Sequence, residues 1–247
     1  MTENCLHDID VVVLAGGLGT RISDTLGDMP KLLAPIDGTP FLEIIIARLR
    51  HFGARRLVLG LGHLSGQVKA YLQDRPTNGS NGGIKIVVAT EPKPLGTAGA
   101  FRFLATKIES DPVLVMNGDS FIGADLCAFL TAHKATGADG SILVTETEDA
   151  ARYGRVELSP LGRVKAFQEK NPEKTGPGTI NAGVYLFNAA MIARIGKTPG
   201  PSLEQDVFQA LEPGTLNAVA GDGPFIDIGT PADLARAADV LKPFIGG

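Results

Sequence analysis

Long hydrophobic runs and basic clusters are both missing from this 247-residue chain. A membrane-spanning helix needs about 20 consecutive apolar residues, and no stretch approaches that length. The net charge is −4, and without a run of lysine and arginine we expect neither nucleic acid nor a membrane surface as a partner. The first eight residues are polar and form no targeting leader, so the sequence predicts a cytoplasmic protein.

Metal-ligating and redox-active side chains are also scarce. The two cysteines, Cys5 near the N-terminus and Cys127 in a predicted helix, have no metal-ligand spacing and are predicted to stay reduced. The four histidines are scattered along the chain, which favours surface or packing roles over a metal or catalytic role. Positive charge and metal ligands, where the protein needs them, must therefore come from a local constellation of other residues.

Apolar strand-like runs alternate with amphipathic helical segments in the first half of the chain. This alternation predicts an α/β protein with a doubly wound, mostly parallel, Rossmann-like sheet. The hydrophobic fraction of 44% is ample for a single core, so we expect one domain over 1–247. The expected strands are Asp10–Leu14, Arg56–Leu61, Ile84–Ala89, Pro112–Met116, Ser141–Thr145, Tyr153–Leu158, Gly183–Phe187 and Leu216–Ala220, and the expected helices are Phe41–Phe52, Gln67–Gln73, Gly99–Ile108 and Pro231–Leu241.

The second half has shorter strands and more glycine and proline. A loop is expected from Lys170 to Thr179, because it contains Pro172, Gly176, Pro177 and Gly178. We interpret this half as a small strand-rich insertion that precedes the terminal helix over 231–241.

The first strand runs directly into a glycine-rich loop, from Leu14 to Arg21. Glycines allow backbone N–H groups to approach a polyphosphate, and Arg21 and Lys31 can supply countercharge. The loop lacks the Lys-Ser/Thr pair of a Walker A motif, and Ile22 stands where a dinucleotide fingerprint needs its third glycine. The segment therefore predicts a phosphate cradle of another kind, the alternative being a strand-to-helix turn without a ligand.

Two carboxylates are candidates for a divalent cation. Asp119 follows the strand 112–116 in the sequence Asn117-Gly118-Asp119, and Asp227 lies between large apolar residues and Gly229. Carboxylates from distant segments suit Mg²⁺, which takes a few oxygen ligands together with phosphate and water. As alternatives, Asp119 caps the helix that begins near residue 125 or closes a turn, and Asp227 caps the last helix through Thr230.

A third segment, Glu91 to Ala100, marks a strand end that turns into a helix start. Gly96 can lie against a flat base while Glu91 accepts hydrogen bonds from the edge of the base. Guanine suits a carboxylate because its edge offers both N1–H and an exocyclic amine as donors. The alternative is a helix entry with Thr97 as the cap.

These motifs, in this order, resemble those of the sugar-1-phosphate nucleotidylyltransferases over about residues 10–240. The resemblance extends to Tyr153-Gly154, Phe167 to Lys170, Asn181 to Tyr185 and Ile226 to Gly229. Pro40 to Glu43, Ser202 to Asp206 and Phe225 to Gly229 look most like the D-glycero-α-D-manno-heptose 1-phosphate guanylyltransferases. The chain departs from the family pattern at Leu32, where many relatives have a second proline, and at Ala98, where a glycine is common.

The resemblance implies transfer of a nucleoside monophosphate from an NTP, with GTP favoured, to a sugar 1-phosphate, with release of pyrophosphate. It implies a nucleotide-binding part over about 8–145, a sugar-binding part over 146–230, and Mg²⁺ on Asp119 and Asp227. A homodimer is the default expectation for assembly. The implied catalytic residues are Arg21 and Lys31; the implied nucleotide-binding residues are Leu14, Ala15, Gly16, Gly17, Gly19, Thr20, Glu91, Pro94, Gly96, Thr97 and Asn117; the implied sugar-phosphate-binding residues are Gly154, Glu169, Lys170, Asn181 and Gly183.

Several related functions stay open at this point. Uridylyl-, thymidylyl- and mannose-1-phosphate guanylyltransferases share most of these motifs. A nucleotide-sugar glycosyltransferase commonly uses an Asp-x-Asp pair, whereas this chain has Asn117-Gly118-Asp119. A binding protein that lost its chemistry is disfavoured by the joint presence of Arg21, Lys31 and the two carboxylates.

Overall fold

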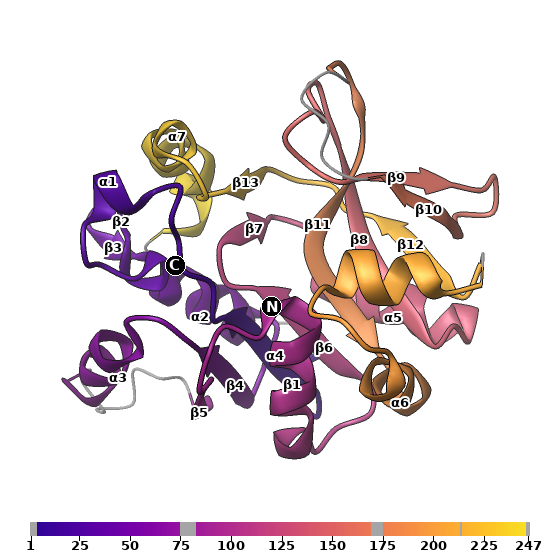
Figure 1. Ribbon diagram of the computed structural model, residues 1–247, viewed down its shortest axis with the longest axis horizontal. Coiled ribbons are helices and arrows are strands. Elements are labelled where there is room, and N and C mark those ends of the chain that lie inside the picture. The colour runs from indigo at the N-terminus through magenta and orange to yellow at the C-terminus, as the bar shows by residue number, and fades with distance from the viewer. Residues whose placement is uncertain (1–3, 75–82, 169–174, 213, 246–247) are drawn as a thin grey trace.

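A mixed nine-stranded sheet forms the centre of the molecule in the computed structural model, which describes residues 4–74, 83–168, 175–212 and 214–245 (Figure 1). The order β10-β9-β11-β6-β1-β4-β5 forms one path through it; β8 pairs with β11, and β12 pairs with β8. The strands are β1 (Asp10–Ala15), β4 (Arg56–Leu61), β5 (Lys85–Thr90), β6 (Val113–Asn117), β8 (Gly140–Thr147), β9 (Arg155–Leu158), β10 (Val164–Gln168), β11 (Gly178–Phe187) and β12 (Leu216–Ala220).

Two further strand pairs lie outside this sheet: β2 (Pro35–Ile36) with β3 (Thr39–Pro40), and β7 (Ser120–Ile122) with β13 (Phe225–Asp227). No helix in the described part of the chain combines the length and the apolar character needed to cross a bilayer. The α-helices are α1 (Ser23–Leu26), α2 (Phe41–His51), α3 (Ser65–Asp74), α4 (Gly96–Leu104), α5 (Leu126–Thr136), α6 (Ala189–Lys197) and α7 (Pro231–Leu241); shorter helical turns are η1 (Lys31–Leu33), η2 (Ala105–Lys107), the π-helical η3 (Leu203–Val207), η4 (Phe208–Ala210) and η5 (Lys242–Phe244).

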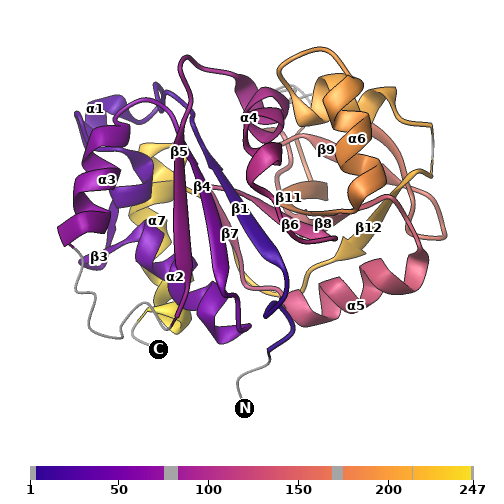
Figure 2. The same ribbon diagram turned by 90° about the horizontal axis from the view of Figure 1, so that it is seen from below.

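Strands β5, β4, β1 and β6 are parallel and fully apolar in their centres. Val12 pairs with Val58 of β4 on one side and with Val115 of β6 on the other. Alternate residues point to opposite faces: Val11 and its neighbours pack with α2, α5 and α7, and Val12 and its neighbours pack with α4 and α6 (Figure 2). Helices thus cover both faces, and the predicted doubly wound α/β fold is confirmed.

The second half of the sheet is antiparallel around β11. This strand pairs antiparallel with β6, β8 and β9, and β9 in turn pairs antiparallel with β10. The prediction of a strand-rich second half is confirmed, but the expected loop over 170–179 is too long at its C-terminal end. Gly178 and Thr179 already belong to β11, because Thr179 pairs with Glu146 of β8.

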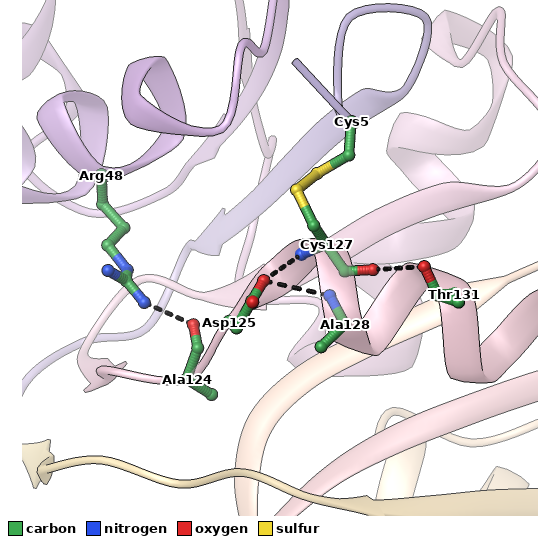
Figure 3. The surroundings of a disulfide bond; sticks show 7 residues. All are labelled: Cys5, Arg48, Ala124, Asp125, Cys127, Ala128 and Thr131. Atoms are coloured by element: carbon green, nitrogen blue, oxygen red, sulfur yellow. Dashed lines mark hydrogen bonds between the residues drawn. A yellow bond between two sulfur atoms is a disulfide. The ribbon is translucent and has the colours of Figure 1, made fainter. Parts of the chain in front are cut away.

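A disulfide joins Cys5 to Cys127 across 122 residues of sequence (Figure 3). The prediction that both cysteines stay reduced is therefore wrong. Cys5 lies in the turn before β1 and Cys127 in the first turn of α5, so the fold brings their Cα atoms to 5.5 Å. The spacing of the two cysteines in the sequence does not reveal that they are close. Their proximity depends on how α5 packs against the sheet. The cytoplasmic location stays a prediction.

We expect reduction of this disulfide to lower the free energy of unfolding by about 2 to 4 kcal/mol. The bond closes a long loop, so reduction restores conformational entropy mainly to the unfolded chain. Urea unfolding of the oxidised and reduced protein measures the difference, and the Cys5→Ser, Cys127→Ser double variant, which should not respond to reductant, is the control. Coinciding unfolding curves for oxidised and reduced wild type would contradict the expectation.

Candidate functional site

A cavity of about 620 Å³ lies beyond the carboxyl ends of β1 and β6. The strand order places β4 and β5 on one side of β1 and β6 on the other, so the connections diverge at this point. Open α/β sheets bind ligands in the crevice that such a divergence creates. Of the predicted site residues, the cavity is lined by Leu14, Ala15, Gly16, Gly17, Gly19, Arg21, Lys31, Glu91, Pro94, Gly96, Thr97, Asn117, Asp119, Gly154, Asn181, Gly183 and Asp227.

One predicted site residue within the described part of the chain, Thr20, is not among those that line the cavity. Thr20 is exposed, and its carbonyl oxygen accepts a hydrogen bond from Ser23 Oγ at 2.9 Å. Glu169 and Lys170 lie outside the described residues. Their proposed contact with a sugar phosphate stays a prediction, although β10 ends at Gln168, whose side chain lines the cavity.

The glycine-rich loop has its composition because neighbouring backbone and side chains come close. A Cβ on Gly16 would lie 2.0 Å from Glu91 Oε1. A Cβ on Gly62, which follows β4, would lie 2.3 Å from the Gly16 carbonyl oxygen. Gly19 has a φ of +65°, in the left-handed region that glycine adopts without strain. The loop therefore folds tightly over the ends of β1 and β4 and exposes backbone to the cavity.

Lys31 and Asp119 form an ion pair inside the cavity. Lys31 begins η1, Asp119 directly follows the Gly118 turn after β6, and Lys31 Nζ lies 2.9 Å from Asp119 Oδ2. The side chains are 18% and 40% exposed, respectively. The Lys31 ammonium occupies a position beside the Asp119 carboxylate that suits a positive charge. The ion pair also places the predicted catalytic lysine beside the predicted metal ligand.

Asp227 is brought to Asp119 by the pairing of β13 with β7. Asp227 pairs in register with Ser120, the residue after Asp119, and Ile228 N donates to the Asp119 carbonyl oxygen at 2.9 Å. The Asp227 carboxylate accepts from Gly229 N at 2.7 Å. A Cβ on Gly229 would lie 3.7 Å from a guanidinium nitrogen of Arg21, so Arg21 also reaches this turn.

The donor set around Asp119 fits a hard divalent cation that shares its coordination with phosphate and water. Within the described ranges no group of three or more histidine, cysteine, aspartate or glutamate side chains could hold a metal. One carboxylate in the turn before β7 and one at the end of β13 match the way Mg²⁺ binds in phosphoryl-transfer sites, through few protein ligands together with substrate oxygens. Asp119 and Asp227 are the residues that would hold it.

Glu91 is a buried carboxylate that lines the cavity directly after β5. It is 6% exposed, and its Oε2 accepts a hydrogen bond from Leu95 N at 3.1 Å. Its Oε1 is buried and has no hydrogen-bond partner within the described part of the chain. Burial raises the pKa of Glu91, while the Leu95 N–H acts in the opposite direction. A buried acceptor without a donor is costly, so this atom is suited to a ligand that donates.

A polar cluster around Glu204 lines the same cavity. Glu204 belongs to the segment Ser202 to Asp206, to which the sequence motifs assign no role in the site. Glu204 Oε1 accepts from Tyr185 Oη at 3.0 Å and from Asn181 Nδ2 at 3.3 Å, and Oε2 accepts from Thr97 Oγ1 at 3.4 Å. Glu204 lies in η3 and thus connects α4 to β11. Only the fold shows this connection, because Thr97 is 107 residues from Glu204 in the sequence.

Asn181 and Gly183 owe their positions to the bend in β11. Asn181 Oδ1 accepts from Gly183 N at 2.8 Å. Gly183 has a φ of +74°, and a Cβ there would lie 2.7 Å from Ser120 Oγ and 2.9 Å from Asn117 Nδ2. A side chain at residue 183 would therefore collide with the wall that carries Asn117.

The helix-cap alternatives for the acidic and threonine residues are not what the structure shows. Asp125, not Asp119, caps α5 by accepting from Cys127 N and Ala128 N. Thr230 caps α7 with its own hydroxyl, which accepts from Asp233 N at 3.3 Å. Thr97 gives no cap bond to α4; instead its hydroxyl accepts from Leu203 N at 2.8 Å.

A glycine cradle, a basic side chain paired with an acidic one, and a second carboxylate meet at the switch point of a doubly wound sheet. This combination is typical of an α/β protein that binds a nucleotide and its phosphates. The chain belongs to the nucleotidyl transferase family, whose model matches residues 10–242. The resemblance noted from the sequence motifs is thereby confirmed.

Individual relatives cover nearly the whole chain. It is 32% identical over 239 residues to a D-glycero-alpha-D-manno-heptose 1-phosphate guanylyltransferase from Aneurinibacillus thermoaerophilus, covering 96% of this chain and 100% of that protein. It is 35% identical over 240 residues to a mannose-1-phosphate guanylyltransferase from Mycobacterium tuberculosis, covering 96% of this chain and 66% of that protein. The crystal structure of HddC from Yersinia pseudotuberculosis complexed with GMP-PN matches with a TM-score of 0.79 at 31% identity, over 94% of this chain and 98% of the other.

Proposed function

We propose that this protein transfers guanylate from GTP to a sugar 1-phosphate and releases pyrophosphate, with D-glycero-α-D-manno-heptose 1-phosphate as the favoured acceptor. Family membership supports the reaction class, and the names of the relatives support the base. The heptose-specific relative is covered over its full length, whereas the mannose-specific one is covered over 66%. A homodimer remains a prediction.

The observation that carries the choice of base is Glu91 Oε1, a buried acceptor that lines the cavity without a partner in the described chain. Guanine offers N1–H and its exocyclic amine along one edge, so it can donate to both oxygens of a carboxylate. Uracil and thymine have only one donor on the corresponding edge. Gly96 lies in the same wall with a φ of +72°, and a Cβ there would lie 2.5 Å from the Pro201 carbonyl oxygen, so packing against Pro201 requires glycine at this position.

The proposed reaction needs no protein nucleophile. An oxygen of the sugar phosphate attacks the α-phosphorus of GTP, the bond between that phosphorus and the bridging oxygen breaks, and pyrophosphate leaves with the electron pair. Positioning and neutralisation of charge supply the catalysis. Backbone of Gly16 to Gly19 would hold the triphosphate, Arg21 and Lys31 would stabilise the developing pyrophosphate, and Asn181 and Gly154 would orient the sugar. Mg²⁺ bound by Asp119 and Asp227 would supply further charge neutralisation.

Replacing Glu91 with glutamine is expected to raise the KM for GTP by at least about tenfold, because a charged acceptor is lost and an amide donor faces the guanine donors. Steady-state kinetics with GTP and with ITP measure this effect. ITP lacks the exocyclic amine, so the substitution should raise the KM for ITP by a smaller factor than the KM for GTP. An unchanged KM for GTP would remove Glu91 from base recognition.

The same carboxylate predicts a pH dependence. Burial raises its pKa, and only the ionised form accepts from both guanine donors. As the pH falls through this raised pKa, Glu91 takes up a proton in the free protein, and the KM for GTP is expected to rise. The Glu91→Gln variant has no carboxyl group to titrate there, so its KM should lack this rise. A wild-type KM for GTP that stays constant as the pH falls to the ordinary pKa range of glutamate would contradict the role of Glu91 in binding the base.

Pyrophosphate release tests the proposed function directly. The assay contains Mg²⁺ and pairs GTP, UTP, dTTP, CTP and ATP each with D-glycero-α-D-manno-heptose 1-phosphate, mannose 1-phosphate and glucose 1-phosphate. Activity confined to GTP with the heptose supports the whole proposal, and activity with GTP and mannose 1-phosphate corrects the sugar alone. Activity with another base overturns the role of Glu91. Nucleotide binding without turnover would indicate a non-catalytic binding protein.

A further inference from the structure

Arg152 connects two segments that are 78 to 81 residues apart in sequence. It lies in the segment 148–154 between β8 and β9, and its guanidinium group donates to both carboxylate oxygens of Asp233 and, at 3.3 Å, to Thr230 Oγ1. Asp233 and Thr230 belong to the start of α7. In Figure 1, β13 lies between α7 and the half of the molecule that carries β9 and β10. The contact therefore ties the strand-rich half to the C-terminal helix.

The anchor on α7 is rigid and buried. Asp233 is 1% exposed, and Thr230 Oγ1 donates to its carboxylate at 2.6 Å. Burial opposes ionisation of Asp233, but the hydrogen bonds from Arg152 and Thr230 and the nearby positive charges outweigh it, so its pKa is lowered. Arg152 is thus the principal partner of a buried carboxylate. A second arginine, Arg236, approaches Asp233 only at 3.7 Å and is 65% exposed.

The residues that follow Arg152 form part of the cavity wall. Tyr153 and Gly154 both line the cavity, whereas Arg152 and Asp233 do not. The Tyr153 ring packs edge-on against Phe225, with centroids 5.6 Å apart, and the Arg152 guanidinium lies 5.9 Å from the Tyr153 centroid. Phe225 begins β13, the strand that ends at Asp227. The guanidinium group therefore connects the segment that carries Tyr153 to the start of α7, and Tyr153 in turn contacts the strand of the second carboxylate.

We propose that Arg152 is a positioning residue for the sugar 1-phosphate, acting through its link to Asp233 and Thr230 to fix Tyr153 and Gly154 against β13. This inference rests on the proposed function. Without the link, the segment 148–154 keeps its own backbone turns, the hydrogen bond from Ala150 N to the Gly176 carbonyl oxygen at 3.0 Å and the Tyr153–Phe225 contact, but it loses its side-chain connection to α7. Misplacement by a fraction of an ångström at such a wall weakens the productive placement of a substrate, although the displaced residues make no bond to the reacting atoms.

The test compares Arg152→Gln with Arg236→Gln. The second substitution removes a positive charge beside the same Asp233 but keeps the hydrogen bonds between Arg152 and Asp233. In Arg152→Gln we expect the KM for the sugar 1-phosphate to rise about tenfold and the KM for GTP to stay within about twofold. Arg236→Gln should change neither. Arg152→Lys should restore part of the loss, because an ammonium can pair with Asp233 but cannot form the two-pronged contact.

A purely structural role would have a different signature. Partial unfolding reduces the concentration of active enzyme, so the apparent kcat falls while both KM values stay constant. Because Arg152→Gln leaves Asp233 buried without its partner, the double variant Arg152→Gln, Asp233→Asn removes that charge and keeps the test possible if the single variant unfolds. A folded variant with an unchanged KM for the sugar 1-phosphate would overturn the proposal.

Hydrogen exchange supplies a readout that does not require turnover. Amides of residues 148–154 should exchange faster in Arg152→Gln than in wild type and at the wild-type rate in Arg236→Gln. Equal rates in all three proteins would contradict the proposal that Arg152 fixes this segment. If wild type releases no pyrophosphate with any substrate pair, the proposed function is wrong, and the exchange rates alone then decide whether Arg152 fixes this wall.

Discussion

Replacing Lys31 with alanine is expected to lower kcat by at least about two orders of magnitude while the protein stays folded. The lysine ammonium lies in the cavity beside Asp119, where a triphosphate would place its negative charge. Charge that develops on the leaving pyrophosphate would lose its principal nearby countercharge. The fold should survive because the Asp119 side chain is 40% exposed and can be solvated once the ammonium is gone.

Steady-state kinetics and a thermal unfolding curve together check this expectation. Lys93→Ala is a matched control, because Lys93 is an exposed lysine near the cavity that is not among its lining residues. It should retain wild-type turnover. A Lys31→Ala enzyme with near wild-type kcat would remove Lys31 from the mechanism.

Asp119→Asn is expected to have a comparable effect, with turnover lowered by at least about two orders of magnitude. The substitution keeps the shape of the side chain but removes the charge that a divalent cation needs. It also removes the charge partner of Lys31, which is 2.9 Å away. We therefore expect both a lower kcat and a higher concentration of Mg²⁺ for half-maximal activity.

A Mg²⁺ titration of activity separates this role from a general loss of function. Asp24→Asn, in the exposed first turn of α1, changes the same charge outside the cavity lining and should leave the titration unchanged. If Asp119→Asn retained wild-type turnover and the wild-type Mg²⁺ requirement, Asp119 would not be a metal ligand and the two-carboxylate site would be wrong.

Much of the parallel half of the fold could be predicted from the sequence because its signals are local. The strands over 56–61 and 216–220 and the helix over 231–241 have the predicted bounds, since continuous apolar runs and one amphipathic stripe determine them. The helix α6 (Ala189–Lys197) and the strand β10 were not predicted. β10 is short and only partly buried, so its apolar alternation is weak, whereas α6 is strongly amphipathic but only nine residues long, which is short for a periodicity signal.

The candidate site divides in the same way. Gly16 and the acidic residues Glu91 and Asp119 stand just after strand ends, where a parallel sheet directs them to one edge. Their grouping follows from the strand pattern alone. Asp227 reaches the same edge only because β13 pairs with β7, a contact between segments about a hundred residues apart.

The sequence by itself determined the doubly wound core, the glycine-rich loop after the first strand and the family, because each depends on residues that are close along the chain. Tertiary structure decided that Cys5 is bonded to Cys127, that Glu204 joins Thr97 to Asn181, and that Arg152 reaches Asp233. These contacts depend on how helices and loops pack against the sheet. The physical reason is that long-range packing is set by the whole core, whereas periodicity and turn chemistry are set by a few neighbouring residues.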